Sequence, residues 1–209
     1  KEPVTSIIGG SKVSTKINVL LNLIQNVNNL IIVGAMANNF LKFKGFNVGL
    51  SLLEKGTEKI INDIYAVAEK NNCNIIIPVD CIVSNNFNGS PKHKSINEIT
   101  SEDMVLDIGK RTVDLINKTI ENSKTVFWNG PAGYFENKSF SSGTISIAKK
   151  IGENTKSKSL ISIVGGGDTL AAIKNTDYQK LFTHLSTAGG AFLESLEGKQ
   201  LPGVKVLTN

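Results

Sequence analysis

Short β-branched runs alternate with longer helix-like patterns along the whole chain, and this alternation limits the possible folds more than any other feature. A parallel sheet with helices on both faces produces such a pattern, because each strand must be followed by a crossover before the next parallel strand can pair. We therefore predict a doubly wound α/β fold. The predicted strands are Val4 to Ile8, Asn29 to Val33, Asn74 to Ile77, Thr125 to Trp128, Leu160 to Val164 and Thr183 to Leu185.

Apolar residues at helical spacing predict the covering helices. The clearest helix runs from Ser14, a predicted N-cap, to Asn26, with apolar residues recurring at three- and four-residue intervals. Further helices are predicted for Glu54 to Asn71, Thr112 to Ile120 and Thr144 to Ile151. The polar segment Asn85 to Ser101 is predicted to be a surface excursion, and a hairpin is one form that it could take. Together these elements predict a Rossmann-like three-layer domain with a mainly parallel six-stranded sheet.

Composition argues against several classes of function. The chain has 209 residues, 40% of them hydrophobic, which suits one large domain with its own core, and it has no apolar run of membrane-spanning length. Of 23 basic residues only Arg111 is arginine, and aromatic residues make up 6%, which is a poor composition for binding nucleic acid. Cys73 and Cys81 are predicted to be buried thiols, since their spacing suits neither a metal site nor a disulfide framework. We expect a soluble, cytoplasmic protein.

Five of the six predicted strands end in glycine or other small residues. In a doubly wound fold the ligand binds at the carboxyl ends of the strands, so these segments would share one rim of the sheet. Small residues at so many positions of that rim would leave space for a large ligand. The segments are Gly9 to Lys12, Gly34 to Ala37, Asn129 to Pro131, Gly165 to Thr169 and Thr187 to Gly190.

The segment Gly165 to Thr169 is predicted to form a turn between a strand and a helix. Such a turn allows backbone N–H groups to approach a phosphate, and the Asp168 carboxylate could hold the accompanying Mg²⁺. The alternative role for Asp168, as a simple helix N-cap, is equally compatible with the local sequence. Neither the glycine spacing of dinucleotide-binding folds nor a Walker A sequence is present, which indicates a phosphate site of another kind.

Lys12 and Lys16 are four residues apart near the start of the first predicted helix. Cations are unfavourable at a helix N-terminus, by about 0.3–1 kcal/mol each, and a bound polyphosphate would remove that conflict. The alternative is that both are surface lysines. Glu136 could accept the hydroxyls of a ribose or could be a solvated acid. His93 is expected at the surface and His184 in the interior, and no Ser/His/Asp arrangement is indicated.

Several long motifs, in the same order along the whole chain, resemble the phosphoglycerate kinase family. The motifs are Gly9 to Ile17, Gly34 to Ala37, Pro78 to Asp80, Leu106 to Gly109, Trp128 to Glu136, Gly165 to Thr169 and Leu196 to Val204. The resemblance covers only the family's C-terminal, nucleotide-binding half, which would here be residues 1–209. The N-terminal domain, which in the family supplies the basic patch for 3-phosphoglycerate, is absent from this sequence.

The resemblance implies a role for each matching residue. Lys12 and Lys16 would contact the nucleotide phosphates, and Lys16 would follow the phosphoryl group during transfer. Asp168 would ligate the Mg²⁺ of the metal–nucleotide, and Thr169 with the Gly166 and Gly167 amides would steady the phosphates, so that Lys16, Gly166 and Gly167 are the implied catalytic residues. The adenine pocket would be formed by Gly34, Ala35, Leu52, Leu106 and Tyr134, and the sugar side by Asn129, Pro131 and Glu136.

The implied parent enzyme transfers a phosphoryl group reversibly between 1,3-bisphosphoglycerate and ADP in glycolysis. We expect the isolated domain to be a monomer that binds MgADP or MgATP with negligible turnover, and to meet 3-phosphoglycerate or 1,3-bisphosphoglycerate only through the missing domain. Thr187 would lie near the interdomain hinge, and the segment Leu196 to Asn209 is expected to be mobile or repacked. A nucleotide-binding module without activity and a dehydrogenase domain are the rival hypotheses. Departures from the commonest family pattern are Ser11, Thr15, Ala35, Lys110, Ala188 and Phe192.

Overall fold

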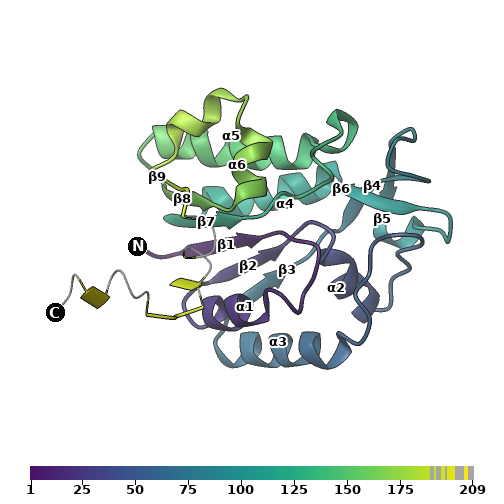
Figure 1. The fold of residues 1–209 in the computed structure, drawn as a ribbon, viewed down its shortest axis with the longest axis horizontal. Coiled ribbons are helices and arrows are strands. Elements are labelled where there is room, and N and C mark those ends of the chain that lie inside the picture. Colours follow the sequence, from purple (N-terminus) through teal and green to yellow (C-terminus); the bar gives the residue numbers. More distant parts are fainter. Residues whose placement is uncertain (189–190, 192–193, 196, 201–204, 207–209) are drawn as a thin grey trace.

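The computed structural model, which describes residues 1–188, 191, 194–195, 197–200 and 205–206, contains the predicted six-stranded sheet. All five neighbouring strand pairs are parallel, in the order β3-β2-β1-β7-β8-β9, so the predicted fold class is confirmed. Figure 1 shows the sheet edge-on through the middle of the molecule. The strands are β1 (Val4–Ile8), β2 (Asn29–Ile32), β3 (Asn74–Ile76), β7 (Thr125–Asn129), β8 (Ile161–Gly165) and β9 (His184–Ser186).

Helices cover both faces of this sheet, as a doubly wound fold requires. Successive residues of β1 point to opposite faces, so Ile7 packs in the core under one helical layer and Ile8 in the core under the other. One layer holds α1 (Ile17–Ile24), α2 (Ala37–Phe43) and α3 (Glu58–Lys70). The other holds α4 (Lys110–Glu121), α5 (Ser142–Lys156) and α6 (Gly167–Ile173), and the two layers lie on either side of the strands in Figure 1.

A second, antiparallel sheet of three strands lies beside the main one, in the order β5-β4-β6. Its strands are β4 (Asp80–Ser84), β5 (Lys92–Ser95) and β6 (Met104–Ile108). β4 and β5 form a hairpin whose connecting loop and second strand fall within the predicted excursion, whereas β4 precedes it and was not predicted. β6 was not predicted as a strand. A small core of Leu41, Val48, Cys81, Val83 and Ile99 joins this sheet to the end of α2. Short 3₁₀ helices cover Ile96–Glu98, Lys138–Phe140 and Asp177–Leu181.

Three local predictions were wrong. Ser14 does not cap α1, which begins at Ile17 and has no side-chain cap. Instead, the Ser14 amide donates to Glu54 Oε2 at 3.0 Å. Glu54 is not in a helix either, because α3 begins four residues later. His184 was expected in the interior, yet it is exposed, since β9 is an edge strand with a neighbour on one side only.

The two cysteines and the lengths of the helices agree with the sequence analysis. Cys73 and Cys81 are free and buried, as predicted, and burial raises their pKa to about 11 and about 12. Within the described residues, no helix has the length and apolar character needed to cross a bilayer. Phe192 and most of the segment Leu196 to Asn209 lie outside the described residues.

Candidate functional site

A cavity of about 450 Å³ opens where the loops after β1, β2, β7 and β8 meet the second sheet. Residues of β6 form one wall, together with the loop that precedes α3, and this wall is mainly apolar. The post-strand loops form the opposite wall. Eight of the residues predicted to bind a nucleotide line this single cavity, namely Gly34, Ala35, Leu52, Leu106, Pro131, Tyr134, Glu136 and Asp168.

The post-strand loops are joined to one another by backbone hydrogen bonds. Gly9 N donates to Asn129 O at 2.8 Å, and Met36 N donates to Gly10 O at 2.8 Å. Gly34 has φ +70°, and a Cβ atom there would lie 3.0 Å from both Gly10 N and Pro131 O. Glycine is required at this position because the left-handed backbone and the neighbouring main chains both exclude a side chain. The predicted convergence at one rim is therefore confirmed for the segments after β1, β2, β7 and β8, whereas Gly189 and Gly190 of the fifth predicted segment lie outside the described residues.

The Lys16 side chain lies against the rim loops, although Lys16 is not among the residues that line the cavity. Its Nζ lies 2.5 Å from Asn129 Oδ1, and the Asn129 amide in turn donates to Gly165 O at 3.2 Å. Burial lowers the pKa of Lys16, and the nearby Asp168 carboxylate opposes this shift. A partly desolvated ammonium group beside a carboxylate that lines the cavity is well suited to binding an anion together with a cation.

The glycine turn after β8 has the predicted form of strand, turn and helix. Gly166 has φ +98° and stands at the N-cap of α6, and Gly167 and Asp168 follow in the first turn of the helix. Thr169 is completely buried, and its Oγ1 accepts a 2.6 Å hydrogen bond from Gly130 N. Thr169 therefore holds the loop after β7 against α6.

Not all of the predicted residues line the cavity. Lys12 is exposed on the loop between β1 and α1 and lies near Glu54. Asn129 was predicted to hold the sugar of the nucleotide, but its side chain is buried and both of its polar atoms bond within the protein. In this structure the Asn129 oxygen accepts from Lys16, and the predicted contact with the sugar stays a prediction. Gly166, Gly167 and Thr169 are neighbours of Asp168 at the start of α6 but are not among the residues that line the cavity.

The sequence analysis assigned no role to several residues at the cavity. Phe87, from the β4–β5 hairpin, packs against Tyr134 with ring centroids 5.1 Å apart. Asp107, on β6, is buried and accepts hydrogen bonds from Gly143 N at 2.8 Å and Ile108 N at 2.9 Å. Burial raises its pKa to about 6. The motif Leu106 to Gly109 was the only signal for this part of the cavity, because the strand it belongs to was not recognised.

The donor chemistry of the site fits a Mg²⁺ ion delivered by a nucleotide. Within the described part of the chain, no three or more His, Cys, Asp or Glu side chains form a group that could hold a metal by themselves. Asp168 offers a single carboxylate at the cavity wall. Mg²⁺ in nucleotide sites is commonly held by one or two carboxylates plus substrate phosphates, so a lone carboxylate is compatible with this arrangement.

Comparison with known proteins agrees with the geometry. The family model for phosphoglycerate kinase matches residues 1–199. Phosphoglycerate kinases of Zymomonas mobilis and Bradyrhizobium diazoefficiens are 45% and 48% identical over 98% and 99% of this chain. The chain spans only 52% of the length of each of these relatives.

Solved structures give the same result. The phosphoglycerate kinase of Coxiella burnetii matches all of this chain with a TM-score of 0.94 and 40% identity, and 53% of its own chain is covered. The enzyme of Pyrococcus horikoshii OT3 matches with a TM-score of 0.79 and 26% identity, with 52% of its chain covered. The chain therefore belongs to the phosphoglycerate kinase family and corresponds to its C-terminal half.

Proposed function

We propose that this chain is the nucleotide-binding half of a phosphoglycerate kinase and binds ADP or ATP together with Mg²⁺ in the cavity between the rim loops and β6. The observation that carries this proposal is the position of Asp168 at the wall of a mainly apolar cavity, with the Lys16 ammonium group close to that carboxylate. A nucleotide matches this arrangement, because it has an apolar base at one end and a charged phosphate tail at the other. The base would lie against Leu52 and Leu106, with the phosphates toward Lys16.

Phosphoryl transfer depends mainly on positioning and on stabilising charge that develops on the moving group. Lys16 suits this role because burial has already removed part of its hydration, so its ammonium group interacts more strongly with an incoming phosphate oxygen. Asn129 holds that ammonium group through a hydrogen bond, and the Asp168 carboxylate attracts it. Bound Mg²⁺ would neutralise charge on the nucleotide phosphates, and Asp168 would be its protein ligand.

The whole enzyme would transfer a phosphoryl group reversibly between 1,3-bisphosphoglycerate and ADP. In this proposal the other half of the protein supplies the phosphoglycerate site, so the chain alone binds nucleotide with negligible turnover. We also propose that it is a cytoplasmic monomer. An assay with 3-phosphoglycerate and MgATP tests the first point, and turnover comparable to that of a whole kinase would overturn it.

Calorimetric titration with MgADP tests the binding site directly. Lys16→Ala and Asp168→Ala are each expected to weaken MgADP binding by about tenfold or more, because each removes a charged partner of the phosphates or their metal. Asp168→Ala should also reduce the difference in affinity between ADP measured with Mg²⁺ and ADP measured with a chelator. Unchanged affinity in both variants would contradict the assignment.

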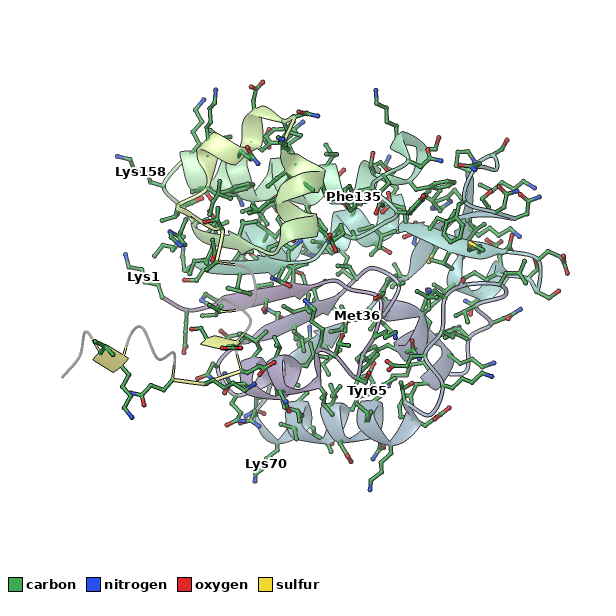
Figure 2. The ribbon with its side chains drawn as sticks, in the orientation of Figure 1. Lys1, Met36, Tyr65, Lys70, Phe135 and Lys158 are labelled. Atoms are coloured by element: carbon green, nitrogen blue, oxygen red, sulfur yellow. The ribbon has the colours of Figure 1, made fainter. Side chains whose placement is uncertain are left out.

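Two substitutions on α3 provide matched controls. Asp63 and Lys70 are exposed on this helix, and Figure 2 shows Lys70 pointing into solvent far from Met36 and Phe135 at the rim loops. Asp63→Ala and Lys70→Ala are expected to bind MgADP like the original chain. The same titration with NAD tests the dehydrogenase hypothesis, which requires NAD to bind at least as well as ADP.

A further inference from the structure

The loop that carries Lys12 and Lys16 is attached to the opposite wall of the cavity through one carboxylate. Glu54 Oε2 accepts from Ser14 N at 3.0 Å, and Glu54 Oε1 accepts from the Ser14 hydroxyl. The Val13 amide adds a further bond, and Lys12 attracts the same carboxylate. These interactions hold the pKa of Glu54 below its ordinary value, the Ser14 bonds contributing most. The carboxylate supplies acceptors for N–H groups just before α1, a helix with no side-chain cap of its own.

The backbone of Glu54 is itself fixed by a buried amide side chain. Asn39 Nδ2 donates to Glu54 O at 2.6 Å, and Glu54 N donates to Asn39 Oδ1 at 3.3 Å. Asn39 is 4% exposed and also donates to Thr57 Oγ1 at 2.9 Å. Because Asn39 belongs to α2, which follows the Gly34 turn, Glu54 stands at a defined position relative to the rim.

The segment before Glu54 forms part of the apolar wall. Leu50 and Leu52 line the cavity, and Leu52 O accepts from Asn38 Nδ2 at 3.2 Å. Asn38 and Asn39, two consecutive residues of α2, thus fix the backbone of the segment that forms the apolar wall. The Glu54 side chain then contacts Ser14 on the lysine-bearing loop. A carboxylate that served only to stabilise a surface turn would not need to join these two parts of one cavity.

We propose that Glu54 is a positioning residue that couples the base-side wall of the cavity to the phosphate-side loop, so that Lys12 and Lys16 are held in place for the phosphates. This inference rests on the proposed function. Ser14 donates the hydrogen bonds that tie the loop to Glu54, and Asn39 fixes the backbone position of Glu54. Loss of the Glu54 carboxylate frees the lysine loop while the apolar wall, held by Asn38, keeps its shape.

Comparing two ligands separates this role from a general effect on folding. MgADP reports on both halves of the cavity, and adenosine reports on the base side alone. NMR titrations following the methyl groups of Leu52 measure both affinities, even where adenosine binds weakly. Glu54→Ala is expected to weaken MgADP binding by about fivefold or more, which corresponds to loss of about one hydrogen bond, with adenosine affinity changed less than about twofold.

A double-mutant cycle tests whether Glu54 acts through Ser14. Ser14→Ala should also weaken MgADP binding, and the Ser14→Ala, Glu54→Ala double variant should bind no more weakly than Glu54→Ala alone, because both changes remove one contact. Glu54→Gln retains one acceptor and should fall between Glu54→Ala and the original chain. Glu69→Ala, at an exposed position on α3, is the matched control and should bind normally.

Each outcome decides the inference. Equal losses for MgADP and adenosine, additive effects in the cycle, or unchanged MgADP binding by Glu54→Ala would each overturn it. Thermal unfolding of every variant identifies a variant that fails to fold, and Glu54→Gln then replaces Glu54→Ala in the test. Failure of the original chain to bind MgADP would instead reject the proposed function.

Discussion

Asn129 accepts a 2.5 Å hydrogen bond from Lys16 Nζ and donates through the same side-chain amide to Gly165 O, so one side chain connects the loop after β1 with the end of β8. The two bonds use the amide oxygen and the amide nitrogen of a residue that is 2% exposed. A lysine on a glycine-rich loop would otherwise have many rotamers of similar energy. Asn129 reduces this freedom before any ligand arrives, which lowers the entropy cost of binding.

Lys16→Met tests whether Lys16 serves binding and not folding. Burial lowers the pKa of Lys16, so its charged form is less favourable in the folded protein than in the unfolded chain. Removing the charge relieves this cost, and we expect that gain to offset the loss of the donor to the buried Asn129 Oδ1 at neutral pH. We expect the free energy of unfolding in urea to be unchanged or higher, with MgADP affinity lowered about tenfold or more. Lys70→Met is the matched control for both measurements. A loss of stability beyond about 1 kcal/mol would mean that the bond to Asn129 is mainly structural.

Thr169→Val tests the link between the loop after β7 and α6. Valine has nearly the same shape as threonine but leaves the buried Gly130 N–H without the acceptor that Thr169 provides at 2.6 Å. An unsatisfied buried donor costs about 1–3 kcal/mol, and urea unfolding should show a loss of this size. Thr119→Val, on the outer face of α4, removes only a local bond to Leu115 O and should change stability by less than about 0.5 kcal/mol. Similar values for the two variants would show that the Gly130 contact contributes little.

Gly34→Ala and Gly56→Ala form a pair with almost the same backbone conformation. Gly34 has φ +70° and Gly56 has φ +71°, so both substitutions incur the same left-handed strain of about 1–2 kcal/mol. A Cβ atom at Gly56 meets nothing within 4 Å, whereas one at Gly34 meets the main chains of Gly10 and Pro131. Gly34→Ala should therefore cost about 1–3 kcal/mol more, because backbone atoms must move. Only Gly34→Ala should also weaken MgADP binding in calorimetry, and equal effects of the two changes would contradict the crowding at the rim.

The strands and the glycine rim were predictable because their signals are local. A buried β-branched run followed by glycine has the same meaning wherever it occurs. β1 ended at Ile8 as predicted, and β7 and β8 each ended one residue later than predicted. The resemblance to a family then added which of the rim residues would contact a nucleotide. Lys16 and Asp168 could each be explained as an ordinary surface lysine and an ordinary N-cap until the family motifs were considered together.

Several contacts and one strand could not be predicted, because they depend on residues that are distant in the sequence. Ser14 resembles a helix cap, but its partner is Glu54, 40 residues later, and nothing local indicates that contact. Asn129 was assigned to the sugar because of its place in a motif, and nothing local indicated that its side chain bonds to Lys16 on the loop after β1 and to Gly165 at the end of β8. β6 was missed because a short strand interrupted by a charged residue lacks alternation, and its ladder partner is β4, which was not predicted either.

Asp107 provides a prediction for the dependence of stability on pH. Its carboxylate is buried at the N-terminus of α5, a helix without a side-chain cap, and burial raises its pKa from the ordinary value of 3.8 to about 6. The folded protein therefore binds a proton more tightly than the unfolded chain between these two values, so this group favours folding less as pH rises toward 6, with no further change above. Relative to Asp107→Asn, which does not titrate, the original chain should lose about 2 kcal/mol of unfolding free energy between pH 4.5 and pH 7.5. Urea unfolding of both proteins at the two pH values measures this difference, and carbon NMR of the carboxyl group measures the pKa directly. A midpoint near 4, with no pH-dependent difference between the two proteins, would show that the hydrogen bonds from Gly143 and Ile108 outweigh burial.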